Sequence, residues 1–446
     1  MTPGAETRFS KPVLPGDLEK KNNLRYRAHS GAVNLRPSWT YFPKNESEIA
    51  QIVAFAREQK MNLRPAGFGH AVQPFNESPT GLILLERMQG LVHVNPEQGE
   101  AIVWGGTNLD RLEKLLADQG LALGYPAEHS GHSLAGALGV GTHGSSRTEG
   151  ILASKVTALT MVTGKGDIVV CSRDKNPDIF RAALLSLGTL GVITKVSMKL
   201  DRLSHVREEM SRVPVAEARQ HIENPDTEAT FSEFIYFPHT EELLTRRLFV
   251  EGAAQAAEAR GREGFLKSIP ARVLAGTSRF LPALSKPLAG VASSLYFRPQ
   301  AQLANDHLLR DAFADGLLME YGLPVDRCAD ALEQVRARFD SERVSFLLPV
   351  HVRFAAADDI YLSSANGRET CFLGLRAPEG QKGRELLNAC EGILREHGGR
   401  PFWGGVFSQD QNFAEVFPGF ESFQAVRRDL DPDEIFLNPT LKKIFG

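Results

Sequence analysis

The feature that most constrains the fold is a glycine-rich segment from Ser130 to Ser146, which reads SGHSLAGALGVGTHGSS. Glycine loses more backbone entropy than any other residue when a helix fixes it. The segment therefore predicts an extended ribbon and no stable helix. A backbone with few side chains can lie close to a long polar ligand, and hydroxyl groups at Ser133, Thr142, Ser145 and Ser146 can bond to it. We expect this ribbon to wrap a cofactor.

Length and charge narrow the class of protein. The chain has 446 residues, which is enough for two or three folding units. Its 51 basic and 54 acidic residues give a formal net charge of −3, which argues against a protein that binds nucleic acid along its phosphate backbone. No run of about 18 apolar residues indicates a transmembrane helix, and the start lacks the pattern of a secretory signal. We expect a cytoplasmic enzyme with no nucleic acid partner and no stable membrane insertion.

Cysteine and histidine spacing predicts no metal site. His132 and His143 lie in the glycine-rich segment and His129 directly precedes it, but these histidines lack the helical spacing and the carboxylate partner that zinc sites usually have. The cysteines are far apart and show no Cys-x-x-Cys spacing, so we expect reduced thiols and no disulfide framework. They are Cys171, Cys328, Cys371 and Cys390.

Helical and strand patterns alternate over the first 200 residues, after a polar N-terminal arm. Asn45 precedes an apolar periodicity that predicts a capped helix ending at residues 59–60. Further helices are expected at 109–119 and 177–186. Strands are expected at 62–66, 82–85, 101–104, 156–162 and 168–171. This alternation is typical of an α+β or α/β nucleotide-binding domain.

The pattern changes after Ser204. Residues 251–293 are alanine-rich and more basic than acidic, which predicts helices separated by prolines. A solvated cap helix is favoured there, with a lid or a membrane-surface element as the alternatives. Strands are expected at 345–354 and 370–375, followed by a helix at 383–396.

A second candidate for ligand binding is the segment from Arg64 to Ala71, RPAGFGHA. Two glycines around a bulky residue after a strand let backbone N–H groups converge on an anion such as a pyrophosphate. The segment lacks the spacing and the following helix of a Rossmann site. His70 at the rim of this loop can be a base, a ligand or a covalent attachment point. Taken alone, the pattern favours an ordinary turn histidine.

Two shorter segments complete the set of candidates. In the segment from Leu187 to Thr194, LGTLGVIT, glycines flank a small apolar run, which fits either a close approach to a flat ring or a tightly packed turn. The segment PVHVRF at 349–354 alternates, so His351 and Arg353 are expected on one face of a strand. That face is a candidate substrate floor, and a solvent-facing strand edge is the alternative.

Taken together, these segments resemble the aldonolactone oxidase and alditol oxidase branch of the vanillyl-alcohol-oxidase-type flavoproteins. The resemblance covers roughly residues 39–446. Its marks, in family order, are GFGH at 67–70, the segment from Ala135 to Gly144, LGTLGVI at 187–193, FPHTE at 237–241, VRF at 352–354 with DDIYLS at 358–363, RE at 368–369, and the tail at 430–445.

The resemblance implies an α+β fold with a two-part PCMH-type FAD-binding domain. An α+β cap domain follows, whose sheet covers the isoalloxazine ring of the flavin. In this sequence the expected divisions are an N-terminal arm at 1–36, the FAD-binding domain at 37–203, the cap at 204–407, and a C-terminal segment at 408–446 that returns to the FAD-binding domain.

The resemblance also implies which residues contact the FAD. His70 matches the histidine that bonds covalently to the 8α-methyl group of the flavin, and its neighbours would hold the pyrophosphate. The ribbon would follow the ribityl chain and the phosphates, and the protein would supply orientation and electrostatics to a redox-active flavin. Besides His70, the implied cofactor residues are Gly67, Phe68, Gly69, Ala71, Ala127, Glu128, Ser133, Gly136, Val140, Gly141, Thr142, His143, Val192 and Ile193.

The substrate side matches the family less closely. Arg353 matches an arginine near flavin N1 and the substrate, but His351 stands where sugar-oxidising relatives have a glutamate. Our hypothesis is that His351 is the general base. Arg376 together with Arg353 is a candidate site for a carboxylate or phosphate, because two cations need a counter-charge. Glu128 falls near the flavin ring and the substrate.

The usual histidine and lysine near the end of the cap are replaced by Phe402 and Gly405. The expected result is a roomier pocket that is less suited to a bare polyol.

The expected activity follows from the resemblance. It is oxidation of a CH–OH centre of a small polar substrate, like an aldonolactone or an alditol, with covalent FAD as cofactor and O2 as acceptor, producing hydrogen peroxide. One rival is a tailoring enzyme for a larger or anionic metabolite, or a dehydrogenase with another acceptor. A second rival is a flavin carrier without catalysis.

Overall fold

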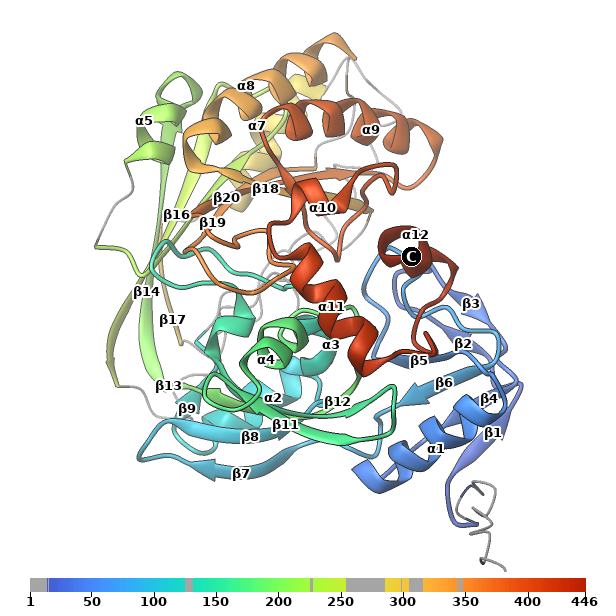
Figure 1. The fold of residues 1–446 in the computed structure, drawn as a ribbon. Helices are drawn as coiled ribbons and strands as arrows, with labels where there is room; N and C mark the ends of the chain where they lie inside the picture. Colours follow the sequence, from blue (N-terminus) through green and yellow to red (C-terminus); the bar gives the residue numbers. More distant parts are fainter. Residues whose placement is uncertain are drawn as a thin grey trace, which may run out of the picture.

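The computed structural model describes residues 14, 16–124, 131–224, 228–253, 285–297, 299–304, 316–342, 344 and 348–446. This part of the chain has a mixed α+β fold in which two smaller sheets lie below one large sheet in the view of Figure 1. The predicted fold class is confirmed.

The first unit is a four-stranded sheet with one helix. The strand order is β1-β4-β6-β5, with β4, β6 and β5 parallel and β1 antiparallel at the edge. The Asn45 side chain accepts a hydrogen bond from Glu48 N at 2.9 Å and so begins the helix, as the sequence predicted. The bounds are β1 (Lys20–Asn22), β4 (Trp39–Tyr41), α1 (Glu46–Glu58), β5 (Leu63–Ala66) and β6 (Gly81–Leu84), and a separate hairpin is formed by β2 (Tyr26–Arg27) and β3 (Asn34–Leu35).

The second unit is a five-stranded antiparallel sheet in the order β11-β10-β12-β8-β7. Figure 1 shows the helices of this unit on the face of the sheet that is turned toward the large sheet. The strands are β7 (Leu91–Asn95), β8 (Glu100–Trp104), β10 (Val156–Thr163), β11 (Ile168–Ser172) and β12 (Gly191–Lys199), and the helices are α2 (Leu109–Ala117), α3 (Leu134–Gly139) and α4 (Pro177–Ala183). A small pair, β9 (Leu121–Ala122) with β13 (Asp201–Arg202), lies beside them.

The cap is built on an eight-stranded antiparallel sheet in the order β17-β14-β16-β15-β19-β20-β18-β21. Helices α8 and α9 contact β18 and β20 on one face, while Tyr296 of α7 packs among Met210, Ile235, Phe237 and Leu244. The strands are β14 (Ser204–Pro214), β15 (Phe231–Tyr236), β16 (Glu242–Ala253), β17 (Gln300–Ala304), β18 (Leu317–Pro324), β19 (Val350–Ala355), β20 (Thr370–Ala377) and β21 (Arg400–Pro401), and the helices are α5 (Ala218–Glu223), α7 (Ser285–Tyr296), α8 (Val325–Ser341) and α9 (Gln381–Glu396). Most of the alanine-rich stretch at 251–293 lies outside the described residues.

The C-terminal segment lies against the first two units. Arg64 on β5 is buried and donates hydrogen bonds to the carbonyls of Phe75, Leu187, Gly188 and Phe436. Four backbone carbonyls from three separate chain segments thus share one guanidinium, which fixes the tail beside the two glycine-containing turns. The tail contains α10 (Phe413–Val416), α11 (Phe420–Leu430) and α12 (Pro439–Phe445).

The glycine-rich segment contains a short helix, so the expectation of a ribbon without a helix is wrong for α3. The Ser133 Oγ accepts a hydrogen bond from Gly136 N at 3.2 Å and caps the first turn. Leu134, Ala137 and Leu138 are buried in the main core. Apolar burial offsets the entropic cost of glycine, because tertiary packing supplies most helical stability in proteins.

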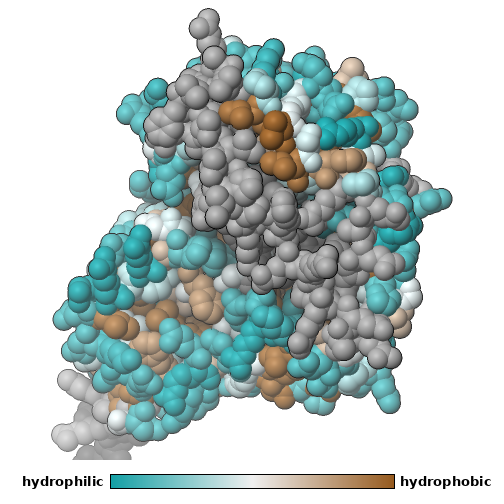
Figure 2. All heavy atoms as spheres, turned by 180° about the vertical axis from the view of Figure 1, so that it is seen from behind, coloured by the Kyte–Doolittle hydropathy of each residue, from teal (hydrophilic) through white to brown (hydrophobic). Residues whose placement is uncertain are grey.

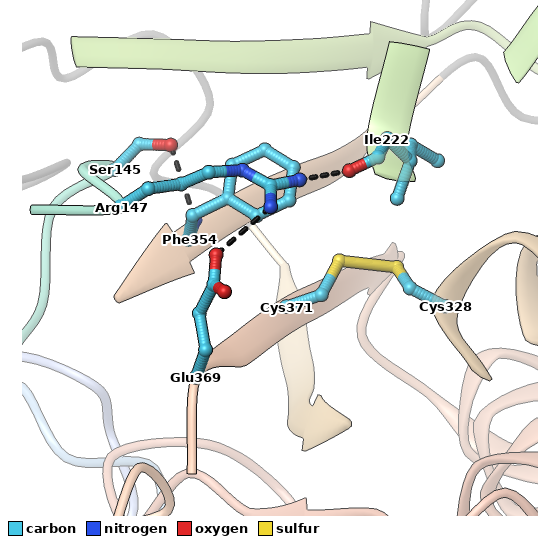
Figure 3. The surroundings of a disulfide bond; sticks show 7 residues. All are labelled: Ser145, Arg147, Ile222, Cys328, Phe354, Glu369 and Cys371. Atoms are coloured by element: carbon cyan, nitrogen blue, oxygen red, sulfur yellow. Dashed lines mark hydrogen bonds and ion pairs between the residues drawn. A yellow bond between two sulfur atoms is a disulfide. The ribbon is translucent and has the colours of Figure 1, made fainter. Parts of the chain in front are cut away.

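Figure 3 shows how the end of this segment is tied to the cap. The Phe354 amide donates to Ser145 Oγ at 3.2 Å, and Arg147 lies over the Phe354 ring with 4.2 Å between its guanidinium carbon and the ring centroid. Arg147 also bonds to Glu369 at 2.8 Å and to the carbonyl of Ile222. One loop of the second unit thus contacts β19, the start of β20 and α5 together.

The same view contains a disulfide between Cys328 on α8 and Cys371 on β20, with Cα atoms 6.2 Å apart. The prediction of four reduced thiols is wrong for this pair, while Cys171 and Cys390 are free and buried. Spacing along the chain could not reveal the bond, because the packing of α8 on β20 joins residues that are 43 positions apart.

The surface gives little indication of a large apolar contact area on the face drawn in Figure 2. Apolar side chains there gather in small patches that hydrophilic residues separate. Among the described helices, none is long and apolar enough to cross a membrane.

Candidate functional site

Two adjoining cavities lie between the smaller units and the cap. The smaller one, of about 170 Å³, is lined by glycine-containing turns that follow β5, β8 and α4. The larger one, of about 1060 Å³, reaches the inner face of the cap sheet. Both cavities are lined by His70, Ala71, His132 and Val140, so they meet at these residues. A long ligand can therefore extend from one into the other.

The structure brings most of the predicted cofactor residues to these cavities. Gly67, Phe68, Gly69, His70, Ala71, Ser133, Gly136, Val140, Val192 and Ile193 line the smaller cavity. Thr142 and His143 line the larger cavity. Gly141 lines neither: its φ of +74° makes a turn, and an added Cβ would lie 2.7 Å from Leu185. Ala127 and Glu128 lie outside the described residues.

The loop after β5 depends on close backbone approach. A Cβ at Gly67 would lie 2.2 Å from Ser133 Oγ, so only glycine fits there. Gly69 has a φ of +72° and lies against Ala28, where an added Cβ would be 2.7 Å from the Cα. The loop is held from outside by Ser30, whose amide donates to the Gly69 carbonyl at 2.9 Å and whose hydroxyl donates to the Ala71 carbonyl at 2.7 Å.

The arm before β4 therefore contributes to the site, which the sequence did not predict. Arg27 and His29 line the larger cavity. The rings of His29 and His132 both lie against His70, with ring centroids 4.3 Å and 4.7 Å from its own. No group of three or more histidine, cysteine or acidic residues in the described chain is placed to hold a metal ion.

The residues present fit a bound FAD. Gly139 lines the smaller cavity, and a Cβ at this position would meet no atom within 4 Å, so a side chain there would extend into the cavity. The hydroxyl of Thr142 is buried beside the larger cavity and has no hydrogen-bond partner among the described residues. A buried hydroxyl without a partner is costly, and a polar cofactor would satisfy it. A glycine-lined cavity next to a polar one matches the shape and polarity of a dinucleotide.

The floor of the larger cavity is the polar face of three adjacent cap strands. In register, Arg353 on β19 lies opposite Phe372 on β20, and Arg376 on β20 lies opposite Leu318 on β18. Arg353, Arg376 and Glu320 all line the cavity. Because side chains alternate along a strand, the apolar residues between them face the other way, toward α8 and α9.

His351 and Arg353 lie on the same strand face, as the alternation predicted. However, His351 is only 4% exposed and is absent from the described lining of both cavities. Its Nδ1 lies 3.2 Å from Arg353 Nη2 and 3.6 Å from Glu233 Oε2. A guanidinium can only donate, so Nδ1 accepts from Arg353. This placement counts against His351 as the base.

Arg353 belongs to a buried row of alternating charges across the sheet. Its Nε lies 3.2 Å from Glu233, which lies 3.1 Å from Arg246, which in turn bonds to Glu208. Burial alone would raise the pKa of Glu233, but the nearby His351 ring and the charges of Arg353 and Arg246 hold it well below its usual value. The expected counter-charge for Arg353 is therefore already supplied by the protein.

Glu320 is the site residue that the sequence analysis missed. Its carboxylate is 2% exposed, lines the larger cavity, and has Oε2 3.1 Å from Nε2 of His143. The His143 ring stacks on Phe372 with centroids 3.6 Å apart and meets the edge of Phe402. The sequence did contain a signal. Glu320 is the only charged residue in the run LLMEYGL at 317–323. A carboxylate within a buried strand is rare unless it is paired or functional.

The loop after β21 places Phe402 against the larger cavity. The next residue, Trp403, is buried among Phe407, Phe413, Phe417 and Phe445, and its Nε1 donates to the Leu362 carbonyl at 2.8 Å. The expectation that Gly405 enlarges the pocket is wrong. Gly405 is not in the cavity lining, and an added Cβ would lie 3.0 Å from the Leu318 carbonyl of β18.

Comparison with known structures supports the fold. A cholesterol oxidase from B. sterolicum covers 100% of both chains with a TM-score of 0.79 at 17% sequence identity. A solvent-stable cholesterol oxidase covers 98% of this chain with a TM-score of 0.80 at 14% identity. At such identities the likeness concerns the fold alone.

Comparison of sequences identifies the family. L-gulonolactone oxidase from Bos taurus is 27% identical over 92% of this chain and 95% of its own length. L-gulono-1,4-lactone dehydrogenase from Mycobacterium tuberculosis is 27% identical over 92% and 96%. An FAD binding domain model matches residues 37–172, and the D-arabinono-1,4-lactone oxidase model matches residues 196–444. The chain therefore belongs to the D-arabinono-1,4-lactone oxidase family and is an FAD-linked oxidoreductase.

Proposed function

We propose that this protein oxidises a CH–OH carbon of an aldono-1,4-lactone or a similar small polyol, with O2 as the electron acceptor and hydrogen peroxide as a product. One observation carries the proposal. The larger cavity presents Arg353, Arg376 and Glu320 at its floor and joins the glycine-lined cavity at His70. The bovine and the mycobacterial relative described above are both named for gulonolactone, a compound of the same chemical class.

We also propose that the FAD is attached through His70. Its imidazole lies where the two cavities meet, next to the rings of His29 and His132. An imidazole nitrogen is a nucleophile able to form a carbon–nitrogen bond. After acid precipitation the yellow colour should remain with the protein pellet. The His70→Ala variant should release its FAD into the supernatant. Release of all colour from the unmodified protein would refute the linkage and leave the family assignment intact.

The side chains on the cavity floor bind and orient the substrate. When bound, FAD supplies the hydride-accepting chemistry. Arg353 is held in place by Glu233, so its charge needs little reorganisation as negative charge develops at the reacting centre, an effect worth about 2–4 kcal/mol for preorganised donors. Arg376 offers a second set of donors to substrate oxygens. The Phe402 ring covers one side of the cavity and excludes water from it.

A second candidate is a larger or anionic substrate, and the charge of the cavity favours it. The described lining contains Arg27, Arg353, Arg376 and Arg384 against Glu320 and Glu379. Glu233 already balances Arg353, but the other arginines leave a positive excess that suits a carboxylate or phosphate. The volume of about 1060 Å³ also exceeds what a small lactone needs beside a flavin ring.

One panel experiment tests both candidates. Peroxide release is measured with the FAD-loaded protein and L-gulono-1,4-lactone, D-arabinono-1,4-lactone, alditols and the matching aldonic acids. Faster turnover of lactones supports the first candidate, and faster turnover of the acids supports the second. Reduction of the flavin without peroxide would replace the oxidase by a dehydrogenase. No reduction with any compound would refute the proposed activity.

A further inference from the structure

We propose that Glu320 is the group that accepts the substrate's hydroxyl proton, with His143 as the residue that positions it. This inference rests on the proposed function. It places the general base on β18, whereas the sequence predicted it at His351 on β19. Four features support it: the strand register, the pairing with His143, the rigidity of β18 and the placement of His351.

The strand register brings Glu320 into the same row of the sheet as His351. Gly374 on β20 lies opposite His351 on β19 and also opposite Glu320 on β18. Since Gly374 has no side chain, the Glu320 carboxylate extends over it, and a Cβ at Gly374 would lie 3.0 Å from Glu320 Oε1. The same Oε1 is 4.0 Å from Arg353 Nη1. The carboxylate thus lies beside the arginine that faces the substrate.

His143 fixes both the position and the charge of this carboxylate. The His143 Nδ1 lies 3.1 Å from the Gly144 carbonyl, which can only accept, so Nδ1 carries a proton. Its Nε2 lies 3.1 Å from Glu320 Oε2, so one further proton lies between these two atoms. Burial disfavours an ionised carboxylate, but an imidazolium at His143 and the nearby Arg353 compensate for it. We infer an imidazolium–carboxylate pair, in which Glu320 can take up a proton.

Strand β18 is held on both sides, which gives the carboxylate a fixed place. It pairs with β20 along its whole length. On its other side, Phe402 N donates to the Glu320 carbonyl at 2.8 Å and Val406 N donates to the Leu318 carbonyl at 2.7 Å. Catalytic groups on strands that are hydrogen-bonded on both sides are positioned more precisely than groups on loops.

His351 is less suited to the role. Arg353 donates to its Nδ1, and the ring lies on the side of Arg353 where Glu233 is found. Glu233 also points at Arg353 and is absent from the described lining of both cavities. Of the carboxylates on this face, Glu320 therefore borders the space where a substrate would lie.

Oxidation of a CH–OH carbon to C=O breaks its C–H and O–H bonds. The hydride and its electron pair go to the oxidant, the flavin of the FAD-linked activity, and the proton of the hydroxyl goes to Glu320. General base catalysis of this kind contributes about 10²- to 10⁴-fold to a rate.

The first test measures anaerobic flavin reduction by stopped flow, with L-gulono-1,4-lactone as the probe, across a range of pH. Glu320→Gln should keep its bound FAD, lose at least 100-fold in the limiting reduction rate, and lose the acid limb of the pH profile. Glu320→Asp should restore part of the rate. The matched control is Glu391→Gln: this buried carboxylate on α9 bonds to Tyr321 of the same strand β18 from the opposite face, and its substitution should change neither quantity.

A second readout does not depend on activity. With ¹⁵N-labelled histidine, His143 in the purified protein at pH 7 should show both ring nitrogens protonated. Glu320→Gln should convert it to the neutral ring with a proton on Nδ1 alone, because an amide donor satisfies Nε2 without an ion pair. A neutral His143 ring in both proteins would overturn the positioning role.

The outcomes separate this inference from the proposed function. If the lactone reduces the unmodified protein and the Glu320→Gln variant equally fast, the proton-acceptor role is wrong while the oxidoreductase function stands. If the unmodified FAD-loaded protein is not reduced by any compound of the substrate panel, the proposed function fails, and the nitrogen signals alone decide whether the His143–Glu320 pair exists.

Discussion

Arg353 and Glu233 face each other across neighbouring strands of the cap sheet, with Arg353 Nε 3.2 Å from Glu233 Oε2. Glu233 also bonds to Arg246 at 3.1 Å, so two buried guanidinium groups share this buried carboxylate. This arrangement fixes the Arg353 guanidinium at the larger cavity before any ligand binds.

Removing the shared carboxylate should therefore destabilise the fold. In Glu233→Ala, Arg353 loses a partner and Arg246 keeps only Glu208, and breaking a buried ion pair from one side costs about 3–5 kcal/mol. Urea unfolding at pH 7 measures this loss. The control is Glu241→Ala, because Glu241 is highly exposed and its ion pair with Arg336 should contribute less than about 1 kcal/mol. Equal effects of the two substitutions would contradict the account.

Arg353→Lys should separate charge from geometry. Lysine keeps the positive charge but cannot contact Glu233 and His351 with separate nitrogens, as the guanidinium does. We expect a loss of about 10²- to 10³-fold in kcat/KM with FAD content unchanged, which corresponds to about 3–4 kcal/mol of transition-state stabilisation. Steady-state kinetics with the best substrate of the panel measures it. Recovery of full activity with lysine would show that a point charge is sufficient.

The sequence predicted the parts of the site that depend on local backbone geometry. Gly67 and Gly69 were recognised from a local pattern, although the residues that exclude a Cβ there, Ser133 and Ala28, are distant in the chain. Strand alternation correctly placed His351 and Arg353 on one face. Asn45 likewise predicted the start of α1, since a cap involves only residues within one turn.

The parts that the sequence could not predict depend on strand order. Glu320 becomes a neighbour of Arg353 only because β18 and β19 flank β20, although the two residues are separated by a helix in the chain. The Cys328–Cys371 bond depends in the same way on the packing of α8 over β20. The contact of Gly405 with the backbone of β18, away from the cavity, depends on the same strand order.

Two glycine substitutions should differ in their effect on the rate of flavin reduction. Gly374→Ala places a Cβ 3.0 Å from Glu320 Oε1, so the carboxylate must shift by a few tenths of an ångström. We expect the rate of flavin reduction to fall about tenfold, since small misplacements of catalytic groups are costly. Gly392→Ala, on the exposed side of α9 with no atom within 4 Å, should leave the rate unchanged and stabilise the fold by about 0.5–1 kcal/mol.

Both glycine variants are measured by anaerobic stopped flow and by urea unfolding. A Gly374→Ala protein with unchanged reduction rate and unchanged pH profile would show that the position of the Glu320 carboxylate is unimportant for the reaction. A Gly392→Ala protein with reduced stability would contradict the solvent exposure of that helix face.

The buried carboxyl of Asp358 should make the stability of the fold depend on pH. Burial raises the pKa of Asp358 from 3.8 to about 6, although Ser363 and the Ile360 amide donate hydrogen bonds to its carboxylate. Because the folded-state pKa lies above the unfolded value, the fold prefers the protonated form. The free energy of unfolding thus loses about 3 kcal/mol from this group as the pH rises from about 4 to 6. Asn does not titrate and can still bond to both partners, so Asp358→Asn should gain stability relative to the unmodified protein across this range and reach a plateau above it.

Asp359 next to Asp358 provides a control of opposite sign for this experiment. Hydrogen bonds from Arg173 and Arg181 lower the pKa of Asp359. Its contribution to stability is therefore present above the unfolded value near 4 and disappears as the pH falls below it. Asp359→Asn should be less stable than the unmodified protein at pH 6 and lose that difference in acid. Urea unfolding of the three proteins between pH 3.5 and 7, at one salt concentration, measures both curves. Parallel curves for Asp358→Asn and the unmodified protein would mean that the Asp358 carboxyl has the same proton affinity in the folded and unfolded chains.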